Sequence, residues 1–338
     1  MHYYDKVKLL VYIPCHSDFK QAAGQAEEVR RQFNDFKQNS NNLTIDIELI
    51  ISVNAYEPTS TERKLAELVC DSVLYNGSGY LADVNISKGF LIALENKPDL
   101  LWLLSTNDNL KPNALKNIFN AFIENKSIDL LVTSLNLDQI FVEKQIIDPA
   151  KIGFSYGLIS AVVYRLERIF PYLHNGPFMA WTGWSQLAVM QSAMDGLGGL
   201  NVRAIPFENV YQQRERDLAS AGKAYAHSIF GMLILGVVLK SSRASTKKFI
   251  RKFVFSNFYA WHLFSRKWNY SKQLVGKENY LAWNQLIAES LIWKNSPLTY
   301  VFYTFAKKFP FENFSENKKI IRIKRGFDKL LNQSKHYK

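Results

Sequence analysis

LLWLLSTNDNLKP, at Leu100–Pro112, is the stretch of this 338-residue sequence that decides its fold. It begins with five apolar residues, which are typical of a buried β-strand. A short polar loop, Ser105–Asn109, follows, and a proline then stands near the first turn of the next predicted helix. The order of strand, polar loop and helix predicts one βα unit, with the loop at the carboxyl end of the strand.

Strands and helices alternate on both sides of this unit. We expect strands at Lys8–Pro14, Ile45–Val53, Ser72–Tyr75, Asp99–Leu104 and Ile128–Thr133. We expect helices at Lys20–Gln38, Thr59–Cys70, Asp83–Glu95 and Pro112–Asn125. This alternation predicts an α/β fold of the Rossmann type, in which a mostly parallel sheet is flanked by helices and ligands bind beyond the carboxyl ends of the strands.

After Gly153 the pattern is looser. The segments expected there are a strand within Tyr156–Tyr164, a helix at Trp181–Met194, a strand within Asn201–Tyr211 and helices from Ala224 onward. The last of these segments is rich in aromatic and basic residues, so we expect a basic helical region at the C-terminal end.

Charge divides the chain into two parts. Residues 1–221 hold 20 Lys and Arg against 25 Asp and Glu, a net charge of −5, whereas residues 222–338 hold 22 against 5, a net charge of +17. The sequence therefore predicts a globular domain over 1–221 and a basic region over 222–338, and the second part is expected to meet an anionic partner.

Composition limits the class of protein. Hydrophobic residues make up 47% of the chain, which excludes overall disorder, and the two cysteines, Cys15 and Cys70, suit buried thiols better than a disulfide framework or a metal cluster. The longest apolar run, Ile229–Leu239, is shorter than the ~20 residues of a membrane-spanning helix. Without a recognisable secretory signal, we expect a cytoplasmic protein that touches the inner face of the membrane peripherally.

Two segments carry a resemblance to a known family. They are Leu100–Pro112 and Gly79–Ala93 (GYLADVNISKGFLIA), in which Gly79, Asp83 and Asn85 match a Gly-x-x-x-Asp-x-Asn pattern. Together they resemble bacterial family 2-type glycosyltransferases of the GT-A fold, particularly rhamnosyl- and abequosyltransferase-like enzymes of surface polysaccharides. The resemblance covers residues 7–135 and, more loosely, 155–217.

The resemblance implies a metal-binding corner with an Asp-x-Asp-type motif. Here Thr106 stands first, Asn107 fills the middle and Asp108 remains as the last acid. A hard cation with oxygen ligands offsets the charge of the donor diphosphate, so Asp108 is expected to bind Mg²⁺ or Mn²⁺. Thr106 and Asn107 are expected beside the donor. The alternative is a polar turn that leads into the next helix.

The resemblance also implies contacts to the donor nucleotide. Asp83 and Asn85 are expected to contact the donor and Lys88 to approach a phosphate, with helix capping as the alternative. Pro14 and His16 fall in the expected nucleotide-base loop, and Asn54 stands where a side chain pairs with a base edge. For His16 the alternative is an ordinary surface turn.

A later charged segment, Gln212–Asp217, falls where related enzymes have a loop that closes over the donor. Arg214 and Arg216 are expected to bind the diphosphate there, and a solvated charge run is the alternative. Trp181 and Trp184 flank Gly183 and are expected to bind the acceptor sugar, with core packing as the alternative.

The catalytic base is the weakest part of the resemblance. Many inverting members have a Glu-Asp pair at the start of a helix, but Phe178–Met190 contains no acid. Asp138, Asp195 and His174 are the remaining candidates.

The basic region interleaves cations with aromatic residues. In Ser241–Trp268 this pattern predicts a helix with an apolar aromatic face that lies on anionic lipid, where each basic residue contributes roughly 1 kcal/mol. Binding to nucleic acid is the alternative for the same residues.

The resemblance thus implies a metal-dependent, inverting glycosyltransferase. It would move a sugar from a nucleotide-sugar to a hydroxyl of a bacterial surface glycan, such as O-antigen, capsule or lipooligosaccharide. Two other functions stay open. One is a non-catalytic scaffold in a glycan-assembly complex, and the other is a basic nucleic-acid-binding protein.

Overall fold

The computed structural model describes residues 7–16, 18–38, 45–54, 57–77, 82–134, 141–145, 159–206, 210–213, 230–239, 245–256 and 277–308. Statements below concern these residues. The candidates Asp138, Arg214 and Arg216 lie outside them.

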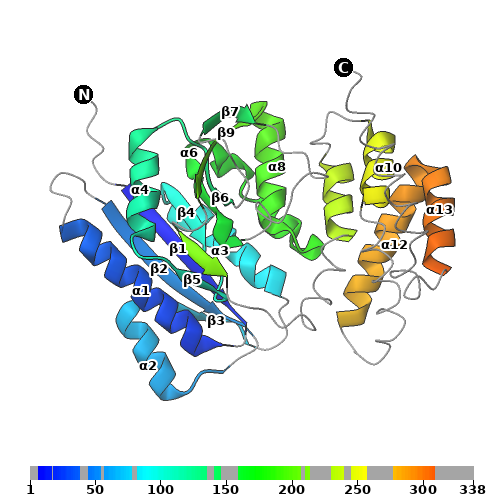
Figure 1. Cartoon of the computed structure of the whole chain (residues 1–338). Coiled ribbons are helices and arrows are strands. Elements are labelled where there is room, and N and C mark those ends of the chain that lie inside the picture. The colour runs from blue at the N-terminus through cyan, green and yellow to red at the C-terminus, as the bar shows by residue number, and fades with distance from the viewer. Residues whose placement is uncertain are drawn as a thin grey trace, which may run out of the picture.

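One mixed sheet forms the centre of the first part of the chain (Figure 1). Its eight strands have the order β3-β2-β1-β4-β8-β6-β9-β7. In chain order they are β1 Val7–Cys15, β2 Ile45–Val53, β3 Ser72–Tyr75, β4 Leu100–Leu103, β6 Leu130–Ser134, β7 Phe141–Gln145, β8 Val162–Arg165 and β9 Leu200–Pro206. Strands β3, β2, β1 and β4 run parallel, as do β6 and β9, whereas β8 lies antiparallel between β4 and β6. The mostly parallel sheet predicted from the sequence is confirmed.

Two details of the strand prediction are wrong. Of the strand expected within Tyr156–Tyr164, the described part begins with a 3-10 turn, and β8 runs only from Val162 to Arg165. The segment expected to be a loop after β4 instead contains the short strand β5, Asp108–Leu110, which pairs antiparallel with β10, Tyr211–Gln213. The pairing places Asp108 opposite Gln213, so long-range contact makes a strand of residues whose local sequence indicates a turn.

Helices cover both faces of the sheet (Figure 1). One face carries α1 Phe19–Gln38, α2 Ser60–Val69 and α4 Ala114–Glu124, and the other carries α3 Ala82–Asn96 and α8 Ser185–Leu197. The helix predicted to begin at Thr59 is confirmed as α2, and Thr59 caps it through a capping box with Glu62. Helix α4 begins two residues later than Pro112, after Asn113 in the left-handed region at φ 64°.

Close packing fixes the position of α3 against the sheet. A Cβ atom at Gly89 would lie 2.6 Å from Leu103 Cδ2 and 2.8 Å from Tyr12 Cδ1, which is closer than packed carbon atoms approach. The glycine therefore lets the helix reach the ends of β1 and β4, where ligands are expected.

A second hydrophobic core lies beside the first. It consists of residues from the helix at 230–238, from α10 Thr246–Ser256, α12 Lys277–Asn295 and α13 Pro297–Lys308. Trp181 and Met232 pack against both cores, and the helix at 230–238 approaches η3 Ala180–Thr182 so closely that a Cβ atom at Gly231 would lie 1.7 Å from the carbonyl oxygen of Thr182. The two parts of the chain therefore meet along a packed seam.

The exposed aromatic face expected in Ser241–Trp268 is wrong for α10. Phe249 and Phe253 are 3% and 1% exposed because they fill the second core, and Lys248 and Arg251 face outward. Residues 257–268 lie outside the described part. None of the described helices is long and apolar enough to cross a membrane.

Candidate functional site

Polar side chains gather at the carboxyl ends of β1, β2 and β3. The first of them is Asn85, which α3 places in the interior at 2% exposure. Its amide nitrogen donates to the backbone oxygens of Cys15 at 3.2 Å and Ser52 at 2.8 Å, which are at the ends of β1 and β2. One side chain thus joins a helix to two strand ends.

The side-chain oxygen of Asn85 also accepts several hydrogen bonds. It accepts from the Tyr12 hydroxyl at 3.1 Å, from Ser52 Oγ at 2.6 Å and from Asn76 Nδ2 at 3.2 Å. Burial raises the pKa of Tyr12, so its hydroxyl stays protonated and able to donate. These contacts make Asn85 a residue that positions the strand ends, and its predicted contact with the donor stays a prediction.

Asn54 and His16 stand together at the same edge. The amide nitrogen of Asn54 lies 3.2 Å from Nδ1 of His16, and the Asn54 backbone N–H donates to the Cys15 oxygen at 2.8 Å. Asn54 is buried, whereas His16 is exposed. Pro14 belongs to the end of β1, paired with Ser52. The structure therefore brings together the three residues predicted to contact the nucleotide base.

Lys88 and Asn76 extend this group toward β3. The Lys88 ammonium donates to Asn76 Oδ1, and Asn76 Nδ2 donates to Ser52 Oγ at 2.7 Å. Burial lowers the pKa of Lys88 below its ordinary value, because it disfavours the charged form. Lys88 was predicted from the sequence, whereas Tyr12, Ser52 and Asn76 were not. The position of Asn76 directly after β3 is the signal that could have found it.

The first turn of α3 meets the first turn of α8. Ser185 Oγ, at the start of α8, donates to the backbone oxygen of Asp83 at 3.4 Å. Two helices thus begin side by side at the carboxyl edge of the sheet, and Asp83 lies where they meet. Helix N-termini favour anions because their first N–H groups lack partners within the helix.

Ser160 fixes the end of β4 and the start of the loop that follows it. Its Oγ accepts the backbone N–H of Ser105 at 2.8 Å, and its backbone oxygen accepts Nε1 of Trp102 at 2.9 Å. Asn107 is exposed and Thr106 is partly exposed, so both neutral side chains are accessible at the tip of the loop. Asp108 is 3% exposed at the start of β5.

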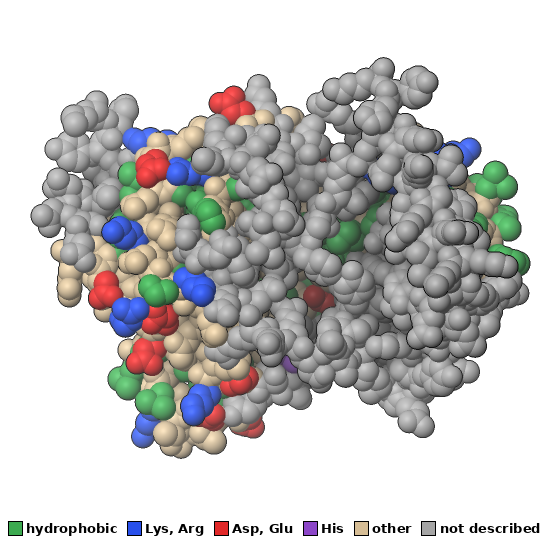
Figure 2. All heavy atoms as spheres, viewed as in Figure 1, with side chains coloured by type: hydrophobic (Ala, Val, Ile, Leu, Met, Phe, Trp, Pro, Cys, Tyr) green, Lys and Arg blue, Asp and Glu red, His purple; other side chains and the backbone are tan. Residues whose placement is uncertain are grey.

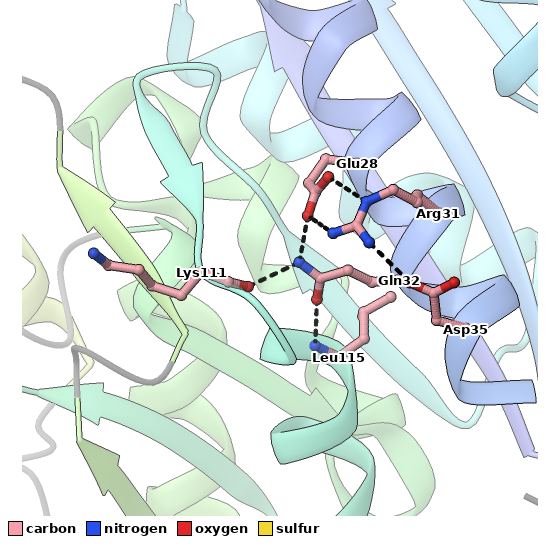
Figure 3. A network of polar contacts seen from close by, with 6 residues as sticks. All are labelled: Glu28, Arg31, Gln32, Asp35, Lys111 and Leu115. Atoms are coloured by element: carbon pink, nitrogen blue, oxygen red, sulfur yellow. Dashed lines mark hydrogen bonds and ion pairs between the residues drawn. The ribbon is translucent and has the colours of Figure 1, made fainter. Parts of the chain in front are cut away.

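Helix α1 holds the other side of this loop (Figure 3). Gln32 donates to the Lys111 oxygen at 2.8 Å and accepts the Leu115 N–H at 3.2 Å, and Glu28 accepts from Gln32 at 2.8 Å. Gln25, nearer the start of α1, donates to the backbone oxygen of Asp108 at 2.5 Å. Asp108 therefore sits in a segment that α1 fixes from one side.

The described residues do not complete a metal site by themselves, so a metal ion at Asp108 would need further oxygen ligands from the donor diphosphate. Calcium and magnesium ions take six or more oxygen ligands, with carboxylates prominent among them. Asp108 is a single buried carboxylate, and the described part of the chain contains no group of three His, Cys, Asp or Glu residues that could hold a metal ion. The predicted Mg²⁺ or Mn²⁺ stays a prediction that only measurement of metal dependence can test.

The two tryptophans predicted to bind the acceptor lie at the seam between the cores. Trp184 is 7% exposed, and Gly231 lies close to its ring, as the core-packing alternative predicts. Trp181 is partly exposed, and its backbone oxygen accepts Nδ2 of Asn284 at 2.9 Å. Helix α12 thus reaches the same segment, so acceptor contact by Trp181 would involve both parts of the chain.

Two proposed bases do not join this group. Asp195 lies ten residues after Ser185 on α8, which is about 15 Å along the helix axis. That end of α8 leads into the start of β9, at the opposite edge of the sheet. His174 is exposed and precedes α7, Asn175–Phe178, whose Gly176 packs against the middle of α3 at Phe90. The fold therefore separates Asp195 and His174 from the carboxyl edge.

Comparison with known proteins identifies the fold. No protein-family model and no curated protein sequence matches the chain. The crystal structure of S. aureus TarS 1–349 is similar with a TM-score of 0.52 at 12% identity, over 89% of this chain and 88% of that chain. TarS 1–349 in complex with UDP-GlcNAc gives a TM-score of 0.51 at the same identity and coverage.

A mannosyltransferase from Pyrobaculum calidifontis, PcManGT, in complex with GDP-Man and Mn²⁺, gives a lower TM-score of 0.44 at 9% identity, over 88% of this chain and 83% of that chain. The two TarS structures confirm the predicted fold class, a GT-A-like sheet flanked by helices.

Proposed function

We propose that this protein is a glycosyltransferase that uses a nucleotide-sugar donor. The observation that carries the proposal is the meeting of His16, Asn54, Asp83 and Lys88 at the carboxyl edge of a GT-A-like sheet. In open α/β sheets, ligands bind at this edge. TarS, which has a similar fold, has been solved with UDP-GlcNAc, and this supports a nucleotide-sugar as the ligand class.

In the proposed arrangement, His16 and Asn54 contact the base, while Lys88 and the first turns of α3 and α8 face the diphosphate. An acceptor hydroxyl attacks the anomeric carbon. A carbon–oxygen bond forms, the bond from that carbon to the phosphate oxygen breaks, and the nucleoside diphosphate leaves with the electron pair. Asp138 is retained as the candidate that takes the hydroxyl proton, because the fold keeps Asp195 and His174 away.

The finer parts of the proposal rest on the sequence resemblance. They are a hydroxyl of a bacterial surface glycan as the acceptor, inversion at the anomeric carbon, hexosyl or related specificity, and Mg²⁺ or Mn²⁺ at Asp108. Peripheral attachment to the inner face of the membrane belongs to the same proposal, and it suits an acceptor that is linked to lipid.

A non-catalytic scaffold is the second candidate function. It is favoured by the single carboxylate at the expected metal corner of the described chain. The two functions differ in turnover. An enzyme hydrolyses or transfers the donor sugar at a measurable rate, and a scaffold binds a nucleotide-sugar or a partner without consuming it.

The test is a thermal-shift screen of UDP-, GDP- and dTDP-sugars, with and without Mn²⁺. A ligand at about 100 times its Kd stabilises a protein by about 2.7 kcal/mol, which raises the midpoint of a chain of this size by several degrees. We expect one nucleotide to give such a shift, and donor hydrolysis to accompany it. A part of the shift that needs Mn²⁺ and disappears in Asp108→Asn would support the metal.

Lys88→Met is the matched variant. Loss of a charge-assisted hydrogen bond to phosphate should lower the affinity for the donor about tenfold or more. The thermal midpoint without ligand should stay nearly unchanged. Lys64→Met, on the exposed surface of α2, is the control and should bind like the parent protein. If no nucleotide shifts the midpoint of the folded protein, the proposal is wrong.

A further inference from the structure

Helices α12 and α13 carry apolar residues on two sides. Inward, Ala288, Ile292 and Tyr303 belong to the second core. Outward stands a second set that is 55 to 85% exposed, here called the α12–α13 apolar face: Trp283, Leu286, Trp293, Leu298, Val301 and Phe305. A helix that is apolar on two sides needs two apolar neighbours, and the described chain supplies one.

The spacing shows that each helix presents a continuous row. In α12 the exposed residues stand at intervals of three and seven, and in α13 at intervals of three and four, so each row lies on one side of its helix. Trp293 and Tyr300 meet edge to face with ring centroids 5.3 Å apart, which ties the end of α12 to the start of α13.

Figure 2 shows hydrophobic side chains at the right-hand margin, where α13 lies in Figure 1, with basic side chains above them.

The charge around this face selects the partner. The region 222–338 has a net charge of +17, and Lys294 follows Trp293 directly at the end of α12. Helix α10, which packs against both α12 and α13, presents Lys247, Lys248, Arg251 and Lys252 to solvent. A second copy of so basic a region would be repelled, whereas an anionic surface would be attracted.

The residue types distinguish lipid from nucleic acid. Leu286, Leu298 and Val301 are aliphatic and have no favourable partner on a base or a phosphate, but they suit the boundary between headgroups and acyl chains. Tryptophan is enriched at the same boundary in membrane proteins. An exposed apolar set of this size also needs a function, because soluble proteins rarely keep one.

We infer that the α12–α13 apolar face inserts into the headgroup region of an anionic bilayer, with Lys294, next to the exposed Trp293, binding a lipid phosphate. The inference rests on the membrane attachment in the proposed function and names the surface that makes it. It names a different surface from the one predicted within α10, because Phe249 and Phe253 are buried in the second core. The helical region would then attach the sheet region to the membrane.

The experiment is co-sedimentation of the full chain with vesicles. One set contains phosphatidylcholine alone and the other an equal mixture of phosphatidylcholine and phosphatidylglycerol. The parent protein should bind the anionic set. The triple variant Leu298→Ser/Val301→Ser/Phe305→Ser should lose about tenfold or more in partitioning, since three exposed apolar side chains no longer insert.

The control is Leu65→Ser/Leu68→Ser on α2. These leucines are 57% and 80% exposed but lie in the sheet region, so the control should bind vesicles like the parent. Thermal midpoints verify that each variant folds. A second variant, Trp293→Phe, should remove part of the fluorescence quenching by brominated lipid, because Trp293 lies in the inserted face.

Other outcomes would overturn the inference. Equal vesicle binding by the triple variant and the parent would do so, as would absence of binding by the parent. The parent protein could instead self-associate, or bind RNA in a salt-sensitive way, without binding vesicles. If the triple variant abolished that interaction, the face would be assigned to another partner. Donor-induced thermal shifts, measured on the same samples, keep the two proposals separate. A donor shift without vesicle binding refutes only the membrane face. Vesicle binding without a donor shift refutes only the sugar transfer.

Discussion

The carboxyl edge of the sheet region and the α12–α13 apolar face of the helical region present different kinds of side chain. In the sheet region Tyr12, Trp102 and Tyr164 are fully buried, and the carboxyl edge of the sheet presents amides, a histidine and a lysine. In the helical region Trp293 and Phe305 are more than half exposed. The first region keeps a polar edge over a closed core, while the second leaves an apolar face beside its core.

This difference agrees with the division of charge. A net charge of −5 over residues 1–221 does not attract an anionic surface, whereas +17 over residues 222–338 does. The two proposals therefore assign sugar transfer and membrane attachment to different parts of one chain. The packed seam at Thr182 and Gly231 holds the two parts in a fixed relation, so a donor site and a membrane face would keep a constant distance.

The largest expected effect compares two phenylalanines of the helical region. Phe253→Ala should lower the free energy of unfolding by about 3–5 kcal/mol, because Phe253 is 1% exposed in the second core. Phe305→Ala should change it by less than about 0.5 kcal/mol, because its side chain faces outward. Urea unfolding curves measure both, and similar losses in the two variants would show that the α12–α13 apolar face is part of a core.

The next effect tests the seam. Gly231→Ala should destabilise the protein by about 3 kcal/mol, since its Cβ atom would overlap the Thr182 carbonyl oxygen at 1.7 Å and the backbone must move. Gly24→Ala, at an exposed position of α1, is the control. Nothing lies within 4 Å of the added atom, so this variant should raise the free energy of unfolding by about 0.5 kcal/mol. A harmless Gly231→Ala would indicate that the two regions are packed less closely than described.

The smallest effect of the series concerns the polar edge. Asn85→Ala should cost about 2 kcal/mol, because the buried Ser52 hydroxyl and the backbone oxygens of Cys15 and Ser52 lose their hydrogen bonds to the Asn85 side chain. Asn96→Ala, at the exposed end of the same helix, should cost much less. Thermal melts without ligand separate this result from Lys88→Met, which should weaken donor binding alone. An Asn85→Ala protein of parental stability that no longer binds donor would make Asn85 a direct ligand contact.

Much of the fold follows from the sequence. The bounds of β2 and β3 agree with those predicted, because a run of β-branched and apolar residues ending in polar ones is a local signal. The polar carboxyl edge follows as well, since each predicted strand ends in polar residues and parallel strands bring those ends together. His16, Asn54 and Lys88 were identified in this way.

Tertiary structure decided what each of these residues touches. The sequence around Asn85 is compatible with a side chain that contacts a ligand and with one that joins strand ends. Only the positions of Tyr12, Ser52 and Asn76 show the second role. Asp108 becomes part of a strand because β10, a hundred residues later, pairs with it.

The helical region shows the same limit. Both α10 and α13 have an apolar face in the sequence, yet Phe253 is buried and Phe305 is exposed. Periodicity determines that a helix has an apolar side, because that property depends on residues three and four apart. Which apolar side is covered depends on the helices that pack against it, and those contacts join residues that are distant in the chain.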